Sequence, residues 1–299
     1  MRFFYSESFT LPLPQGHRFP VQKYEMLKTS LLAEKLVPQE ALHISPRAED
    51  EFVFQAHTED YVQALTDGSI DPKDMRRIGF PWSEHIAERG RRTTGGALMA
   101  ARMALKDGLS GQLAGGTHHA HASFGAGFCI FNDFAVVAKT LLDEAVVDRI
   151  AIIDLDVHQG DGNAAILKDD PRIFILDFYG EKNFPFRKVP ATLNVPLADN
   201  MGDTDYLEEL EKYLPKVWAF QPDIVLYQAG VDPLKEDALG RLDLTHEGLM
   251  ERDHMVLKGC WERGIPCSMA IGGGYANPIE PTVMAYMNTY KVAKSIYGF

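Results

Sequence analysis

The sequence predicts an α/β protein, a single domain in which an open, mostly parallel β-sheet carries helices on both faces. Two observations support this class. Short, nearly continuous apolar runs recur along the 299 residues, as expected for strands buried on both faces, and amphipathic segments separate them. No internal repeat or low-complexity linker divides the chain, so we expect one domain spanning residues 1–299.

The expected elements alternate from the N-terminus onward. The apolar runs predicted as strands are residues 1–5, 111–114, 150–154, 172–178, 193–196, 224–228 and 266–271. The amphipathic segments predicted as helices are residues 95–106, 134–142, 204–219, 245–263 and 281–295. Because the ligand of such a sheet sits beyond the carboxyl ends of its strands, the residues that follow each run carry most functional information.

Composition narrows the class of protein. The apolar content of 45% and charged content of 24% are typical of a globular protein, and no apolar stretch is long enough for a membrane span. The N-terminus reaches Ser6 and Glu7 too soon for a secretory leader, so we expect none. Cys129, Cys260 and Cys267 are too few for a disulfide framework, which favours a cytoplasmic location. The net charge of −12 argues against direct nucleic-acid binding and slightly favours a cationic partner.

Polar clusters follow four of the expected strands. They are Gly-Gly-Thr-His-His at 115–119, the run from 154 to 162, Ala-Gly-Val-Asp at 229–232 and Gly-Gly-Gly-Tyr at 272–275. Parallel strands place their carboxyl ends at one edge of the sheet, so these clusters are expected to converge. The fact that four clusters are expected at the same edge is stronger evidence for a functional site than any single cluster.

The run from 154 to 162 indicates a metal site. Side chains on a strand alternate faces, so Asp154, Asp156 and His158 are expected to point the same way, with Asp161 arriving from the following loop. Carboxylates crowded at the end of an apolar strand need a cation or a proton network to compensate them. Asp156 and His158 supply two ligands and Asp232 a third, leaving one position for water. The alternative for Asp232 is a turn before the following proline.

The remaining polar residues suit hydrolysis at that metal. His118 and His119 are adjacent, so their side chains are expected to point apart to different partners, and Asp154 and Asp161 are free to orient one imidazole each. A histidine held by a carboxylate beside a metal-bound water is a general base. Tyr275 offers a hydroxyl to a developing oxyanion. The alternatives are satisfied core histidines and a core tyrosine next to a turn.

Other chemistries fit less well. No Gly-x-Ser-x-Gly elbow exists in the chain, which argues against a serine nucleophile. Cys129 lies among apolar residues and is expected to be buried filler. The three glycines at 272–274 lack the Lys-Ser/Thr of a phosphate-binding loop.

Together these motifs resemble the histone deacetylase family of the arginase/deacetylase fold. The resemblance extends from His17 and residues 57–61 to Tyr275, and it rests on Gly-Gly-x-His-His, Gly-Phe-Cys, Asp-x-Asp-x-His-x-Gly-Asp-Gly and Gly-Gly-Gly-Tyr. The connection from 178 to 185 and an expected helix start at 92–96 look like class IV and its bacterial relatives.

The resemblance implies roles for particular residues. It implies zinc, with iron in the cell left open, at Asp156, His158 and Asp232, and it pairs His118 with Asp154 and His119 with Asp161, with Tyr275 polarising the scissile carbonyl. It also implies a tunnel for the acylated lysine stem lined by Gly127, Phe128 and Phe184. A structural potassium ion is implied at Asp154, Asp156, His158, Asp177 and Phe178, with Asp177 replacing the serine of class I.

Three positions depart from the family pattern. Gln159 replaces a second histidine, on a side chain expected to face away from His158. Residues 80–83 offer no aspartate to grip a peptide backbone at the rim. The arginine that lines an internal channel in class I has no certain match, and Lys23 is the nearest candidate.

The expected function is metal-dependent hydrolysis of an N-acyl lysine amide in a protein or peptide. One alternative is a small acylated amine such as an acetylpolyamine on the same machinery, and another is a non-catalytic acyl-lysine binder. A dinuclear, arginase-like site is disfavoured because Pro233 and Leu234, not a second aspartate, follow Asp232. The acyl length and the oligomeric state are left open.

Overall fold

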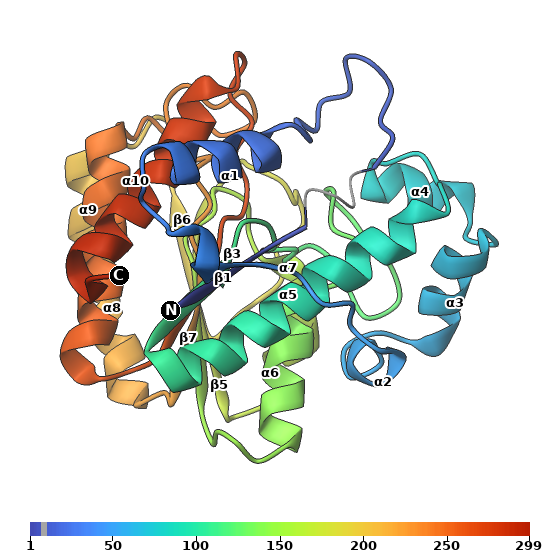
Figure 1. Ribbon diagram of the computed structural model, residues 1–299, viewed down its shortest axis with the longest axis horizontal. Helices are drawn as coiled ribbons and strands as arrows, with labels where there is room; N and C mark the ends of the chain where they lie inside the picture. Colours follow the sequence, from blue (N-terminus) through green and yellow to red (C-terminus); the bar gives the residue numbers. More distant parts are fainter. Residues whose placement is uncertain (7–10) are drawn as a thin grey trace.

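The computed structural model describes residues 1–6 and 11–299, and its centre is an eight-stranded sheet. The strand order is β2-β1-β3-β8-β7-β4-β5-β6, and every pairing is parallel, which confirms the predicted fold class (Figure 1). The strands are β1 (Arg2–Tyr5), β2 (Leu42–Ile44), β3 (Leu109–Gln112), β4 (Ile150–Asp154), β5 (Ile173–Gly180), β6 (Leu193–Leu197), β7 (Ile224–Gln228) and β8 (Cys267–Ala270).

Helices connect the strands and cover both sides of the sheet. They are α1 (Lys23–Ala33), α2 (Asp50–Val53), α3 (Glu59–Asp67), α4 (Pro72–Ile78), α5 (His85–Asp107), α6 (Asp133–Asp143), α7 (Asp161–Leu167), α8 (Asp203–Phe220), α9 (His246–Arg263) and α10 (Glu280–Tyr297), with a 3-10 turn at Gln39–Ala41. Figure 1 shows α8, α9 and α10 on one side of the strands and α5 and α6 on the other.

The core lies on the two faces of the sheet. On β4, Ala151 and Ile153 pack with apolar residues of α1, α8, α9 and α10, whereas Ile150 and Ile152 pack with those of α5, α6 and α7. Alternate residues of a strand face opposite ways, so a strand buried on both sides must be apolar throughout. A third apolar cluster joins α3 and α4 to Phe131 and forms a lobe beside the sheet.

The sequence prediction missed several elements near the N-terminus. Strand β2 has three residues and lies at the edge of the sheet, and α1, α3 and α4 were not predicted. Helix α5 begins at His85, so the helix start expected at 92–96 is wrong and this segment lies inside the helix. A Cβ on Gly95 or Gly96 would meet residues of the segment 45–48, which explains why glycines stand inside this long helix.

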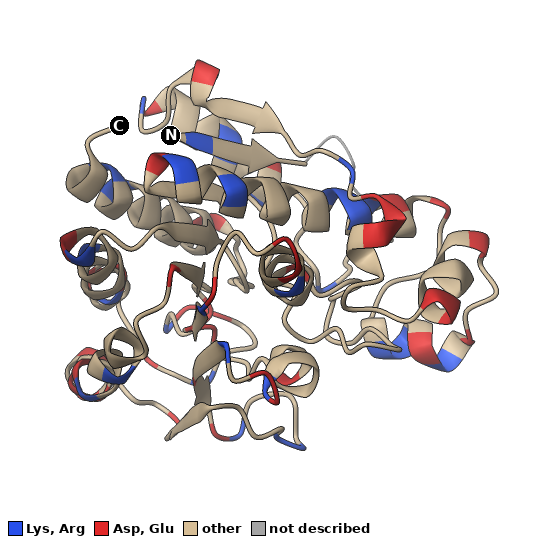
Figure 2. Ribbon diagram, turned by 90° about the horizontal axis from the view of Figure 1, so that it is seen from below, with Lys and Arg blue, Asp and Glu red and all other residues tan. Residues whose placement is uncertain are grey.

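Within the described part of the chain, no helix is both long enough and apolar enough to cross a membrane. Figure 2 shows acidic and basic residues interspersed along the helices.

Candidate active site

The four polar clusters follow strands that are neighbours in the middle of the sheet. Strands β3, β8, β7 and β4 lie side by side in that order, although β8 comes last in the chain. Their parallel direction brings the following loops to one edge. The sheet order therefore assembles residues from positions 118 to 275 into one site.

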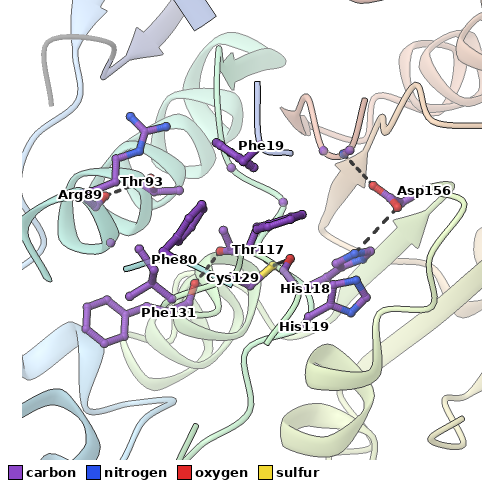
Figure 3. A pocket seen from close by; sticks show the side chains of 18 of the residues that line it. Phe19, Phe80, Arg89, Thr93, Thr117, His118, His119, Cys129, Phe131 and Asp156 are labelled. Carbon is purple, nitrogen blue, oxygen red and sulfur yellow. Dashed lines mark hydrogen bonds and ion pairs between the residues drawn. The ribbon is translucent and has the colours of Figure 1, made fainter. Parts of the chain in front are cut away.

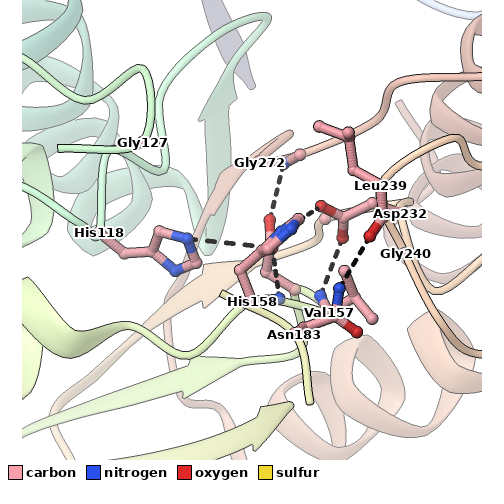
Figure 4. Close-up of polar contacts among 12 residues, drawn as sticks. His118, Gly127, Val157, His158, Asn183, Asp232, Leu239, Gly240 and Gly272 are labelled. Carbon is pink, nitrogen blue, oxygen red and sulfur yellow. Dashed lines mark hydrogen bonds and ion pairs between the residues drawn. The ribbon is translucent and has the colours of Figure 1, made fainter. Parts of the chain in front are cut away.

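Asp156, His158 and Asp232 form the centre of this site. Nδ1 of His158 lies 3.1 Å from Oδ1 of Asp156 and 3.0 Å from Oδ2 of Asp232, and all three residues are buried. One ligand atom from each lies within 4.8 Å of the others, and Figure 4 shows His158 and Asp232 pointing toward one another. Ligands bound to zinc at about 2.0–2.2 Å in a tetrahedron are roughly 3.3–3.6 Å apart, so the spacing fits such an ion after small side-chain shifts.

Backbone groups fix the two carboxylates. The Gly273 N–H donates to Oδ2 of Asp156 at 2.7 Å, and the Val157 N–H donates to Oδ1 of Asp232 at 2.8 Å. Each carboxylate thus turns its other oxygen toward His158. Strand β4 ends at Asp154, so the expectation that Asp156 and His158 occupy one strand face is wrong, and they lie in the loop before α7.

The charges of this cluster favour a bound cation. Burial and then the charge of Asp156 raise the pKa of Asp232 to about 7. Burial disfavours the charged imidazole, but hydrogen bonds to Asp156 and Asp232 outweigh it and raise the pKa of His158 to about 10. Two buried carboxylates around one imidazole therefore need compensating positive charge, which a divalent ion supplies.

Two histidine–carboxylate pairs lie beside the cluster. Nδ1 of His118 lies 2.8 Å from Oδ2 of Asp154, and Nδ1 of His119 lies 2.7 Å from Oδ1 of Asp161. The imidazoles have different partners, but they do not point apart, because their ring centroids are 4.1 Å from each other. Asp161 is the first residue of α7 and not part of a loop as expected.

The two imidazoles differ in proton affinity. Burial opposes the charged form of His118, but the charges of Asp154 and Asp156 raise its pKa to about 10. Burial and then the charge of His118 lower the pKa of His119 to about 4. His119 is therefore neutral near pH 7 and donates through Nδ1 to Asp161, which leaves the lone pair of Nε2 free to accept a proton.

Tyr275 lies across the cavity from these histidines. Its backbone N–H donates to Oδ2 of Asp237 at 2.6 Å, and its ring centroid lies 6.3 Å from that of His158. Burial, followed by the charges of Asp232 and Asp156, raises the pKa of Tyr275 well above its usual value. The phenol therefore keeps its proton and is a hydrogen-bond donor.

Two of the three predicted tunnel residues line this cavity, and the third contacts His119. Gly127 and Phe128 line the cavity, and the Phe184 ring packs edge-on against His119 with centroids 4.9 Å apart. Gly127 has a φ of 52°, and a Cβ there would lie 2.6 Å from Cδ2 of His119. A glycine is thus required next to the histidine.

The cavity continues inward from the metal-binding cluster. Figure 3 shows His118, His119 and Asp156 at one end and Arg89 and Thr93 at the other, and the volume open to water-sized molecules is about 60 Å³. Arg89 was not predicted as a site residue, and its guanidinium donates to the carbonyl of Ser6 at 2.8 Å.

Lys23, the residue proposed for the internal channel, is buried and lines the same cavity. Its Nζ donates to the carbonyl of Gly274 and to the hydroxyl of Tyr286, each at 3.1 Å, and lies 4.8 Å from the ring centroid of Tyr275. Burial lowers the pKa of Lys23 to about 8. The amino group of Lys23 therefore lies over the ring of Tyr275.

The residues expected around potassium are all buried, and two of them, Asp156 and His158, also belong to the Asp-His-Asp cluster. Oδ2 of Asp177 accepts from the Gly160 N–H at 3.1 Å, whereas its Oδ1 has no hydrogen-bond partner among residues 1–6 and 11–299. Burial and the charge of Asp154 raise the pKa of Asp177 well above its usual value. Phe178 follows it on β5 with 1% of its surface exposed. An unpartnered buried carboxylate oxygen is compatible with a cation at this position.

Two supporting carboxylates were missed by the sequence analysis. Asp133 accepts from the backbone N–H groups of Gly116 and Thr117 at 2.8 and 2.9 Å and so holds the turn before His118. Asp237 holds the backbone of Tyr275 in the same way. Their targets are backbone groups of distant loops, so no sequence spacing marks them.

The chain belongs to the histone deacetylase family, because the family model described as the histone deacetylase domain matches residues 17–290. It is 38% identical to an uncharacterized protein of Picosynechococcus sp. over 98% of both chains. It is also 29% identical to Histone deacetylase 2 of Arabidopsis thaliana, over 91% of this chain and 73% of that protein.

Solved structures place the fold in the same family. The crystal structure of an HDAC homolog complexed with SAHA matches with a TM-score of 0.85 and 28% identity, covering 100% of this chain and 84% of the other. An HDAC homolog from Aquifex aeolicus matches with a TM-score of 0.83 and 27% identity, over 99% and 84% of the two chains. The fold is therefore the arginase/deacetylase fold, and the chain is a histone deacetylase-family amidohydrolase with a candidate metal site.

Proposed function

We propose that this protein hydrolyses the N-acyl amide of an acylated lysine in a protein or peptide, with residues 1–299 as one catalytic domain. The observation that carries the proposal is a buried Asp-His-Asp cluster with a neutral, carboxylate-held histidine on one side and a protonated tyrosine on the other. The aromatic groups of Phe128, Phe184 and His119 suit a flat amide and an alkyl stem.

The metal proposed at Asp156, His158 and Asp232 is zinc, with iron as the alternative in the cell. A bound ion of this kind supplies a Lewis acid that lowers the pKa of water and polarises a carbonyl. The donor set of two carboxylates and one imidazole is that of a three-ligand catalytic site. A structural potassium ion beside Asp154, Asp177 and the backbone of Phe178 is a second proposal, supported by the unpartnered oxygen of Asp177.

Different side chains take part in the proton transfer from water, the stabilisation of the amide oxygen and the protonation of the leaving amine. His119 accepts the proton of the attacking water at Nε2, while Asp161 holds its Nδ1 proton and stabilises the imidazolium that forms. Tyr275 donates to the amide oxygen as negative charge develops on it. An imidazolium of the His118–His119 pair then protonates the leaving amine, since cleavage of the C–N bond requires a proton on nitrogen.

The test is hydrolysis of a substrate panel by purified protein with measured metal content. Acetyl-lysine and longer acyl-lysine peptides should be cleaved, chelation should abolish turnover, and zinc should restore it. Asp232→Ala should retain no stoichiometric metal. Turnover that persists after chelation would contradict the proposal.

The same panel separates the substrate classes. Acetylspermidine cleaved faster than every peptide would identify a small-amine amidohydrolase, for which the absence of an acidic residue at 80–83 is the supporting observation. Tight hydroxamate binding without hydrolysis of any acyl amide would identify a non-catalytic binder.

A further inference from the structure

The carboxylate of Asp161 holds two imidazoles. Oδ1 lies 2.7 Å from Nδ1 of His119, and Oδ2 lies 3.0 Å from Nε2 of His121. Burial disfavours ionisation of Asp161, but the hydrogen bonds from His119 and His121 outweigh it and keep its pKa below the usual range. An ionised carboxylate only accepts hydrogen bonds, so both imidazoles donate. His119, the proposed general base, and His121 therefore both donate to the Asp161 carboxylate, one to each oxygen.

His121 is itself held in place. Its backbone N–H donates to the carbonyl of Phe124 at 2.8 Å, and its imidazole stacks on the Phe124 ring with centroids 4.3 Å apart and an interplanar angle of 17°. The guanidinium of Arg77 lies 4.4 Å from the centroid of that phenyl ring. These contacts fix the direction of Nε2, and the side chain is 18% exposed, so it lies between Asp161 and solvent.

Among the residues that the structure describes, the other histidine–carboxylate pair has no such third side chain. Oδ2 of Asp154 faces His118, and its Oδ1 accepts from the Asp156 backbone N–H at 3.3 Å. The second oxygen of Asp154 thus has a backbone N–H as its donor, whereas the second oxygen of Asp161 has the imidazole of His121. A side chain can be replaced without moving the backbone, which makes this contact testable.

We propose that His121 is a positioning residue for the general base, a role that rests on the proposed hydrolysis. Its N–H fixes the plane of the Asp161 carboxylate, so that the opposite oxygen keeps His119 oriented with Nε2 toward the cavity. Without that donor, Oδ2 loses its partner on a side chain that is 9% exposed. The carboxylate then turns toward solvent, and the imidazole of His119 loses its fixed direction.

Two substitutions separate the hydrogen bond from the packing. His121→Phe keeps a flat ring for stacking on Phe124 but has no N–H, whereas His121→Gln keeps a donor at a similar reach and loses the ring. On the cleaved acyl-lysine peptide we expect the phenylalanine variant to lose about 10–100-fold in kcat with little change in KM. The glutamine variant should recover most of that loss. His254→Phe, a half-buried histidine of α9 that does not line the cavity, is the matched control and should behave as wild type.

A second readout does not depend on turnover. The Nδ1 proton of His119, shared with Asp161, should give a low-field proton resonance in metal-free and zinc-loaded protein, identified by its loss in Asp161→Asn. His121→Phe should shift or broaden this resonance, and His121→Gln should preserve it. An unchanged resonance and unchanged kcat in His121→Phe would overturn the positioning role, as would equal damage in the two variants. If no acyl amide is cleaved by wild type, the proposed function fails while the resonance still tests His121.

Discussion

Arg252 should support the two loops that bear the proposed metal ligands. Its guanidinium is fully buried and donates to the carbonyls of Leu155 and Gly230 at 3.3 and 2.5 Å, and it pairs with Asp253 at 2.7 Å. Leu155 immediately precedes Asp156, and Gly230 lies two residues before the other aspartate of the cluster. Replacing Arg252 by methionine keeps much of the volume but removes every donor.

The loss of stability in Arg252→Met can be estimated from Asp253, which stays buried without its ion-pair partner. Among the described residues, the side chain of Asp253 is then left with the hydroxyls of Tyr227 and Thr289, at 2.5 and 2.6 Å. Removing one partner of a buried ion pair costs about 3–5 kcal/mol. An unfolding entropy of about 2.1 cal/mol/K per residue over a chain of this length converts that cost into a fall of about 5–8 °C in Tm.

The assay is calorimetric melting of metal-free protein, followed by zinc titration. Arg252→Met should melt lower and bind zinc more weakly than wild type. Arg252→Met combined with Asp253→Asn should recover part of the loss, because no buried carboxylate is then left without its ion-pair partner. Arg172→Met is the control, since that arginine is 53% exposed beside Asp170 and exposed pairs contribute little. A wild-type Tm in Arg252→Met would refute this reasoning.

Other expected outcomes concern the catalytic groups and pH. His119→Ala should lower kcat by about 10²–10⁴-fold at unchanged fold, and equal turnover on an acetyl-lysine coumarin substrate would contradict the base assignment. Tyr275→Phe should lower it by about 10²–10³-fold, with hydroxamate affinity and metal content as controls. Burial lowers the pKa of His57 to about 4 in the folded protein. Below a pH of about 6.5, this histidine is therefore protonated in the unfolded chain but stays neutral in the folded chain until the pH reaches about 4. The free energy of unfolding should therefore fall as pH drops from 6.5 to 4, by about 3 kcal/mol from this group, and His57→Gln should reduce the slope in urea titrations.

The edge of the sheet that carries the site could be predicted because the pattern that indicates it, an apolar run followed by a polar cluster, lies within a few consecutive residues. Each cluster follows an apolar run, and on β4 the residues before Asp154 are apolar and buried on both faces. Parallel direction then brings the clusters to one edge of the sheet, and the strand order decides which of them become neighbours. The order itself, with β8 between β3 and β7, could not be predicted, because no residue of these strands marks its neighbour.

The contacts that orient the catalytic groups were harder to predict. The expectation for Asp156 and His158 extended a strand beyond Asp154, whereas backbone groups such as the Gly273 N–H curve this segment into a loop. The candidate ligand types could be predicted from their chemistry, but their convergence depends on backbone donors that lie 75 and 117 residues away in the sequence. The role of His121 could not be predicted for the same reason. Its partner Asp161 comes close to it only when α7 is in place, so the position of His121 two residues after His119 does not indicate the contact.

The site also depends on the completed sheet. Its residues follow β3, β4, β7 and β8, which pair only when crossover units distant in sequence have docked. The unfolded chain therefore cannot bring Asp156, His158 and Asp232 within 4.8 Å, and a metal that binds them binds the folded state alone. Linkage then stabilises the whole domain by about 4 kcal/mol at a free metal concentration of a thousand times Kd. Before metal binds, the mutual repulsion of the buried carboxylates opposes folding, so the same residues that make the site reactive make the metal-free domain less stable.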